Sequence, residues 1–173
     1  FHYTWDDRAN SGFAMLGEVF STYGVKKASL ESRPTAKNLQ QASIYVIVDP
    51  DTEKETAQPN YMQAQDVAVI KDWVKAGGVL LLMSNDSGNA EFKHFNLLPE
   101  AFGIHFNENS KNRVQRDNYP EGAVMIPAQH SVFGHTQKVY IKELSTVTTK
   151  NPAVVILKNG DDNVAAISKY GKG

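Results

Sequence analysis

The stretch "SNDSGNAEFKH", from Ser84 to His94, concentrates side chains that could do chemistry. Ser87 before a glycine would be a nucleophile if a strained turn exposed it and a histidine and an acid lay beside it. Such a turn needs small residues where Asn85 and Asn89 stand, and no histidine has a spacing that selects it as the base. The candidate bases are His94, His105, His130 and His135. A catalytic serine is therefore the less favoured interpretation.

The same stretch holds two carboxylates, Asp86 and Glu91, which could act as a pair. Two carboxyl groups roughly 5–10 Å apart across a cleft can cleave a glycosidic bond. Glu91 and His94 are three residues apart, so on a helix they would share one face and hydrogen-bond. A di-iron site would need a second Glu-x-x-His motif, which the sequence lacks. We expect a Glu91–His94 hydrogen bond, no metal and no cofactor.

The amino-terminal segment "FHYTWDDRANSGF" offers a binding surface. An aromatic ring can stack on a pyranose while carboxylates accept hydrogen bonds from its hydroxyl groups. The alternative is a solvated loop that one tryptophan anchors. Together with the polar turn, in which Asn85 and Asp86 should bond the backbone and Asn89 should cap the next helix, it gives a predicted set of carbohydrate ligands. The set is Trp5, Asp6, Asp7, Asn85, Asp86, Asn89, Glu91 and His94.

Two further polar segments are weaker candidates. In "AQHSVFGHT", His130 can cap a short turn over Phe133, and His135 follows it. The run "NENSKNRVQRDN" carries three cations that could clamp an anion, although a solvated loop is the favoured interpretation. These cations are Lys111, Arg113 and Arg116.

Composition limits the class of protein. The chain has 173 residues, of which 41% are apolar, enough for a single core, so one domain over 1–173 is expected. A net charge of −1 argues against nucleic-acid binding and against a basic membrane-binding surface. No apolar run approaches the roughly 18 residues of a membrane span. The absence of cysteine removes thiol nucleophiles, disulfides and thiolate metal sites.

Hydrophobic periodicity predicts the elements that would position these residues. Ser11 can cap a helix over 12–23, and a second, strongly amphipathic helix follows a β-branched run. The main predicted elements are a strand over 43–51, a helix over 63–76, a strand over 79–83, a helix over 91–102 and a short strand over 104–106. Strand, helix and strand at this spacing indicate a parallel βαβ unit. In parallel sheets ligands bind beyond the carboxyl ends of the strands, here at 49–51, at 84–89 and before the first helix.

The chain beyond 106 has a different pattern of residue types. Residues 107–121 are polar and rich in turns, and four β-like runs follow. Asn159-Gly160 is a hairpin signal between the last two runs. The predicted fold is a three-layer, flavodoxin-like α/β domain: a mostly parallel sheet flanked by helices over 1–106, and a β-rich antiparallel part over 107–173.

Four segments together resemble a known domain. They are "FHYTWDDRANSGF", "IYVIVDPDTEKETAQPNYM", "WVKAGGVLLLMSNDSGNAEFKHFN" and "FGIHFNENSKNRV". They resemble the class I glutamine amidotransferase-like domain that some bacterial polysaccharide-utilisation enzymes carry after an unsaturated glucuronyl or rhamnogalacturonyl hydrolase domain. The resemblance implies a flavodoxin-like sheet and a piece of a longer chain. It does not bring amidotransferase chemistry, because the turn after "VLLLM" offers no cysteine.

From the resemblance we expect a non-catalytic accessory domain of a polysaccharide-degrading glycoside hydrolase. Its partners would be an oligosaccharide ligand and the catalytic hydrolase domain of the same parent chain, with no nucleic acid and no membrane. A periplasmic or extracellular location fits that context. The alternative is a hydrolase that acts on carbohydrate through Ser87 or through Asp86 and Glu91. A third hypothesis is a purely structural domain.

Overall fold

A computed structural model describes residues 3–9 and 12–173 of the chain, and the predicted helix cap Ser11 lies outside them. The first helix, α1, covers Ala14–Thr22, close to the predicted bounds. Thr35 caps the short helix α2, Ala36–Leu39, by accepting a hydrogen bond from the backbone of Asn38. Within the described residues no helix is long and apolar enough to cross a bilayer.

The predicted βαβ unit is confirmed. Strand β1, Ile44–Val48, pairs in parallel with β2, Val79–Met83, and helix α3, Ala64–Ala76, connects them. The apolar residues that predicted α3 do pack: Ile70 and Val74 are buried in the core that this helix shares with β1 and β2. Asp66 caps the helix start by accepting from the backbone of Gln63.

The chain after β2 has less helix than its pattern indicates. Residues 93–96 form turns, and α4 covers only Leu97–Glu100. The Glu91 carboxylate accepts hydrogen bonds from the backbone N–H groups of His94 and Phe95, and Pro99 supplies no N–H to a longer helix.

The remaining strands pair antiparallel. Strand β3, Ile104–Phe106, pairs with β6, Val147–Thr149, and β4, Ala123–Met125, pairs with β5, Lys138–Tyr140. Strands β7, Val154–Asn159, and β8, Asp162–Ile167, form the hairpin that Asn159-Gly160 predicts, and Gly160 has φ +59°. A 3₁₀ turn, Tyr119–Gly122, precedes β4.

The expected three-layer flavodoxin-like fold is wrong. Among the described residues only β1–β2 is parallel, and the other pairs are small antiparallel sheets. The expected division at residue 106 is crossed by the β3–β6 pair, because β3 lies before it and β6 after it. The prediction placed β3 with β1 and β2 in a mostly parallel sheet over 1–106, whereas β3 pairs antiparallel with β6.

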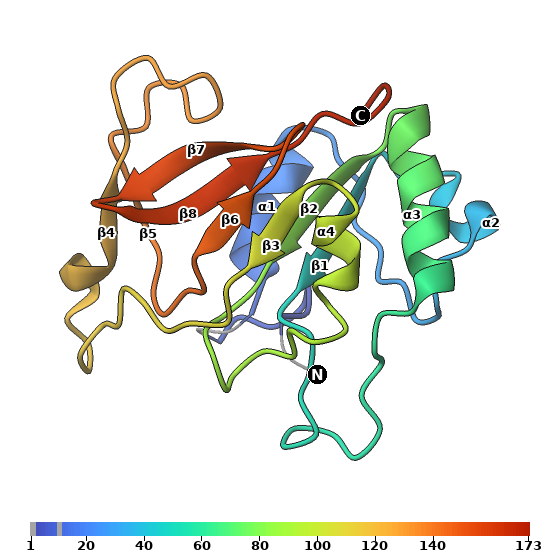
Figure 1. Ribbon diagram of the computed structural model, residues 1–173, viewed down its shortest axis with the longest axis horizontal. Coiled ribbons are helices and arrows are strands. Elements are labelled where there is room, and N and C mark those ends of the chain that lie inside the picture. The colour runs from blue at the N-terminus through green and yellow to red at the C-terminus, as the bar shows by residue number, and fades with distance from the viewer. Residues whose placement is uncertain (1–2, 10–11) are drawn as a thin grey trace.

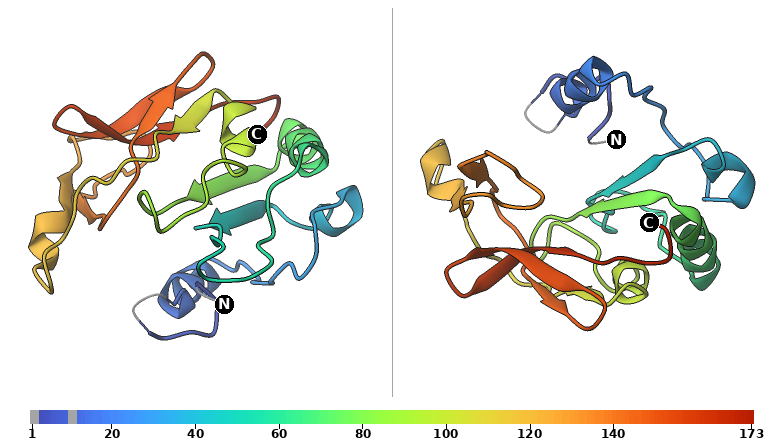
Figure 2. Two further views of the ribbon diagram at one scale, coloured as in Figure 1. Left: turned by 60° about the horizontal axis from the view of Figure 1, so that its bottom comes forward. Right: turned by 90° about the horizontal axis from the view of Figure 1, so that it is seen from above.

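Figure 1 shows β7 and β8 beside β6, with β4 and β5 further out, and α3 at the other end of the molecule. Figure 2 shows the β1–β2 pair between α1 on one side and the β7–β8 hairpin on the other. A cluster of buried side chains joins the parallel pair to the antiparallel part. It consists of Ala90, Phe92, Phe95, Phe106 and Val147.

Candidate functional site

An open cavity of about 240 Å³ lies at the carboxyl end of β1. Its lining consists of carboxylates, an amide, a phenol and apolar side chains. The lining contains no lysine or arginine among the described residues. The lining residues are Tyr3, Ile47, Val48, Asp49, Pro50, Asp51, Asn60, Met62, Glu91 and Phe95. This is the edge at which a parallel pair presents loop side chains from both strands.

Asp49 ties three segments together at this cavity. Its Oδ2 accepts a hydrogen bond from the Tyr3 hydroxyl at 2.8 Å, and its Oδ1 accepts from the Asn85 backbone N–H at 3.0 Å. Burial raises the pKa of the Asp49 carboxyl, and the hydrogen bonds from Asn85 and Tyr3 oppose that shift. Asp49 has φ +42°, a conformation that non-glycine residues adopt rarely and mostly at functional or tightly constrained positions.

Tyr3 contributes the aromatic face of the cavity. Its ring lies 5.5 Å from the Phe13 ring, centroid to centroid, which fixes the segment before α1 against that helix. Burial, then the hydrogen bond to Asp49, raises the pKa of Tyr3 to about 12. Tyr3 therefore stays protonated at neutral pH and presents a hydroxyl group.

Glu91 also lines the cavity, and the predicted Glu91–His94 hydrogen bond is confirmed. His94 Nδ1 lies 2.9 Å from Glu91 Oε1, and the backbone N–H of Glu91 donates to the Pro50 carbonyl at 3.0 Å. The His94 ring stacks on Tyr61, with centroids 4.2 Å apart. This stack adjoins the cavity, since Asn60 and Met62, on either side of Tyr61, line it.

Asp86 faces inward and away from solvent. Only 1% of its surface is exposed, its Oδ1 accepts from Asn89 Nδ2 at 2.5 Å, and its N–H donates to Asn85 Oδ1 at 2.9 Å. Asn85 and Asp86 thus bond the turn as predicted, whereas Asn89 bonds Asp86 and caps no helix. Asp86 does not line the cavity with Glu91, so these two carboxylates do not face a common substrate.

Ser87 is exposed, and its backbone N–H donates a hydrogen bond to the Asn109 carbonyl at 3.3 Å. Three of the four histidines considered as its base form hydrogen bonds elsewhere in the described structure: His94 bonds Glu91, His105 bonds Glu100, and His130 bonds the Ile156 carbonyl. None of the hydrogen bonds among the described residues joins Ser87 to a histidine. The geometry supports a polar turn here and gives no nucleophile–base pair.

Trp5, Asp6 and Asp7 lie apart from the cavity lining. The Trp5 ring packs 6.2 Å from the Phe20 ring, and its indole N–H donates to the Ala28 carbonyl at 3.3 Å, so the tryptophan anchors the segment to α1. Asp7 Oδ1 accepts from the Ala9 N–H within a turn. Asp6 is exposed.

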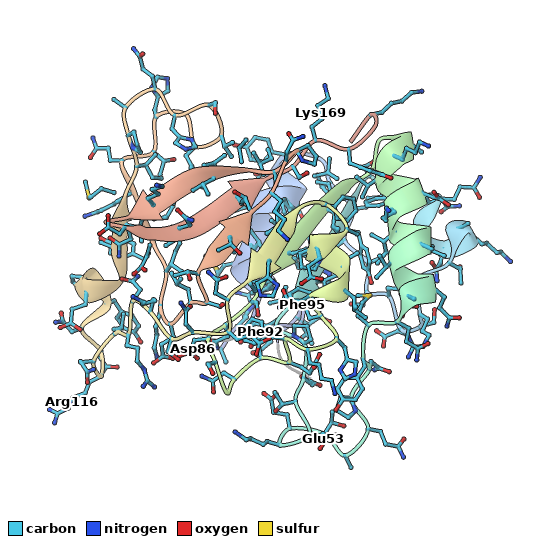
Figure 3. The ribbon with its side chains drawn as sticks, in the orientation of Figure 1. Glu53, Asp86, Phe92, Phe95, Arg116 and Lys169 are labelled. Atoms are coloured by element: carbon cyan, nitrogen blue, oxygen red, sulfur yellow. The ribbon has the colours of Figure 1, made fainter. Side chains whose placement is uncertain are left out.

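The weaker candidates lie away from the cavity. His130 caps its turn as predicted, because Nδ1 accepts from the N–H groups of Val132 and Phe133. Lys111 pairs with Asp162 at 3.2 Å. Figure 3 shows Arg116 at the outer left edge of the molecule and Glu53 on the loop at its lower edge. The described residues form no cluster of three or more side chains suited to a metal ion.

Sequence reasoning selected 49–51 as a ligand-binding place but did not select Asp49 or Asp51 as site residues. The rule on strand ends was the available signal. Tyr3 lies in the segment before the first helix that the same rule selected, although it was not named as a site residue. Asn60 and Met62 carried no such signal, because they reach the cavity only through the folding of the loop after β1.

These features define a chain with one parallel βαβ unit and several small antiparallel sheets, built around a polar cavity at a strand end. A structure of this kind is already solved: the mmIFT52 N-terminal domain is similar over 94% of this chain and 80% of that chain, with a TM-score of 0.63 and 20% identity. At that identity the likeness shows the fold alone. No protein-family model matches the sequence. No curated protein matches it either.

The expected membership of the glutamine amidotransferase-like domains is therefore wrong. The similar structure is the mmIFT52 N-terminal domain, and the strand pairing differs from a flavodoxin-like sheet. Two of the four segments that suggested the family, 44–62 and 73–96, cover β1, the end of α3, β2 and the adjoining loops. A βαβ unit of this kind occurs in many unrelated folds.

Proposed function

We propose that this chain is a non-catalytic domain that contacts carbohydrate through the cavity at the end of β1. The observation that supports this function is the cavity lining, where Asp49, Asp51 and Glu91 stand beside Tyr3 and the apolar Met62. Carboxylate oxygens accept hydrogen bonds from sugar hydroxyl groups, and an aromatic or thioether side chain packs against the C–H groups of a sugar ring. The volume is below the roughly 300–1,000 Å³ of typical small-molecule sites, so the cavity suits one sugar unit of a longer chain.

The positions of the predicted catalytic groups support a non-catalytic role. Among the described residues no hydrogen bond joins Ser87 to a histidine, and Asp86 is buried and bonded to Asn89. The hydrolase domain in the same parent chain and the periplasmic or extracellular location stay predictions. The sequence of the complete parent protein and its localisation in cells would test them.

Isothermal titration calorimetry of the 173-residue chain with neutral and amino-sugar oligosaccharides tests the proposed function. Asp51 is the residue to change, because it lines the cavity and its side chain forms no hydrogen bond with the other described residues. Asp51→Asn should weaken binding by about tenfold, since hydrogen bonds to charged groups contribute about 1.5–3 kcal/mol. The exposed Asp161, in the turn between β7 and β8, provides the matched control Asp161→Asn.

Two results would contradict the proposal: no heat of binding with any oligosaccharide, or equal affinity of the Asp51→Asn and wild-type chains. Release of new reducing ends from the ligand would contradict the non-catalytic part of it.

A further inference from the structure

An aromatic stack lies beside the cavity at the end of β1, and the rings of Tyr61 and His94 form it. The two ring planes are inclined by only 22°, with their centroids 4.2 Å apart. The residues on either side of Tyr61 line the cavity, and so does Glu91, whose Oε1 lies 2.9 Å from His94 Nδ1. The stack therefore borders the cavity.

Hydrogen bonds hold both residues of the stack in place. The Tyr61 hydroxyl donates to Glu53 Oε1 at 2.9 Å, and the Tyr61 carbonyl accepts from Arg33 Nη1 at 3.3 Å. The His94 N–H donates to Glu91 Oε1 at 3.0 Å. A ligand that used these rings would find them already ordered, which lowers the entropic cost of binding.

The stack is not part of the hydrophobic core. Tyr61 belongs to none of the three buried clusters of the described residues and is not among the side chains packed against them, although its neighbour Met62 is. The His94 side chain is 34% exposed. His94 covers one face of the Tyr61 ring, and no other described aromatic ring stacks on Tyr61. Burial in the core therefore does not explain why these two rings are held together here.

We propose that this stack is the subsite for the sugar unit next to the one in the cavity, an inference that rests on the proposed function. The cavity suits one unit, so the next unit of a chain would lie at its border, where an aromatic ring offers an apolar face to the C–H groups of a pyranose. Glu53 Oε2 forms no hydrogen bond with the other described residues, so it can accept one from a sugar hydroxyl group. The carboxylates of Glu53 and Glu91 would repel a uronic acid, so the expected occupants are neutral and amino sugars.

NMR titration of the 173-residue chain with glucose, cellotetraose, glucosamine and the glucosamine tetrasaccharide tests the subsite. Tyr61→Ala should weaken binding of the tetrasaccharide by about five- to tenfold, since it removes an aromatic contact. It should leave the affinity for the monosaccharide unchanged, because the cavity alone holds one unit. Tyr61→Phe keeps the ring and should keep most of the tetrasaccharide affinity. Tyr119→Ala, at an exposed tyrosine in the 3₁₀ turn before β4, is the matched control and should change neither affinity.

A second measurement keeps the proposal testable if Tyr61→Ala does not fold. In the wild-type chain the tetrasaccharide, and not the monosaccharide, should shift the ring proton signals of Tyr61 and His94.

The outcomes separate this subsite from the proposed function. If none of the four sugars shifts any signal of the wild-type chain, the proposed function fails and the subsite fails with it. Tetrasaccharide binding that Tyr61→Ala does not weaken, or that leaves both ring signals unshifted, would overturn the subsite alone. Equal losses of monosaccharide and tetrasaccharide affinity in Tyr61→Ala would also overturn it, because the tyrosine would then only shape the cavity.

Discussion

At the scale of single residues, Asp49 is the position on which the site depends. Its carboxylate receives the Tyr3 hydroxyl and the Asn85 N–H, so it holds the amino-terminal segment and the turn after β2 at one edge. Loss of either donor would leave a half-buried carboxylate with fewer partners, which costs more than the net contribution of the hydrogen bond itself. Asp49 therefore both shapes the cavity and lines it.

The raised pKa of Asp49 predicts a pH dependence of stability. The pKa in the folded chain exceeds the reference value of 3.8, so the folded state keeps this proton to higher pH than the unfolded state does. Stability from this group is therefore highest below pH 3.8 and falls as pH rises through the folded pKa. Asp49→Asn should remove that fall, which urea unfolding from acidic to neutral pH would measure.

The matched control is Asp161→Asn, an exposed position that should leave the wild-type profile unchanged. The assignment would fail if both variants showed the same profile, or if the stability of Asp49→Asn still fell over the same pH range by the same amount.

At the scale of elements, Asp66 decides where α3 begins. It is buried, and its Oδ2 accepts from the Gln63 N–H at 2.9 Å and from Arg33 Nη1 at 2.5 Å. Asp66→Ala removes the cap and the ion pair together, so we expect a loss of about 1–2 kcal/mol in the free energy of unfolding. Urea denaturation measures this loss.

Asp72, an exposed carboxylate on the same helix, provides the control. Asp72→Ala should change stability by no more than about 0.5 kcal/mol. Equal losses in the two variants would show that helix propensity or charge, and not the cap, explains the result.

The elements also show what a sequence can predict. Continuous apolar runs and a 3.6-residue period identified β1, α3 and β2, because these signals are local. The stretch after β2 has the same kind of apolar spacing, yet Glu91 bonds the N–H groups of His94 and Phe95 and a turn results. Strand partners depend on contacts between distant residues, such as Phe106 with Val147, and so the sheet arrangement was wrong.

The candidate site, too, could be predicted from the sequence only in part. The rule on strand ends located the edge, and the Glu91–His94 spacing gave a correct hydrogen bond. Trp5 has polar neighbours in sequence, whereas its neighbours in space are Phe13 and Phe20, outside the cavity lining. Tyr3 reaches the cavity only because the loop before α1 folds back onto Asp49.

At the scale of the whole molecule, one cluster joins the parallel and antiparallel parts, and Phe95 is at its centre. Phe95 is 1% exposed, and its ring lies 5.5 Å from that of Phe106 on β3. The cluster to which it belongs packs against residues of β1, β2 and β8. Because both parts share this contact, we expect them to unfold together. Phe95→Ala should lower the free energy of unfolding by about 3–5 kcal/mol.

Two probes test whether the parallel and antiparallel parts lose the same free energy of unfolding. Tryptophan fluorescence reports on α3 through Trp73 and on the segment before α1 through Trp5, and amide exchange of the β7–β8 hairpin reports on the antiparallel part. Both should shift by the same free energy in Phe95→Ala. Tyr23→Ala, at an aromatic that is 82% exposed, should shift neither. If only the fluorescence transition moved, the hairpin would have a stability of its own. The sheets would then be two independent units, and the cavity that Phe95 lines would belong to the βαβ unit alone.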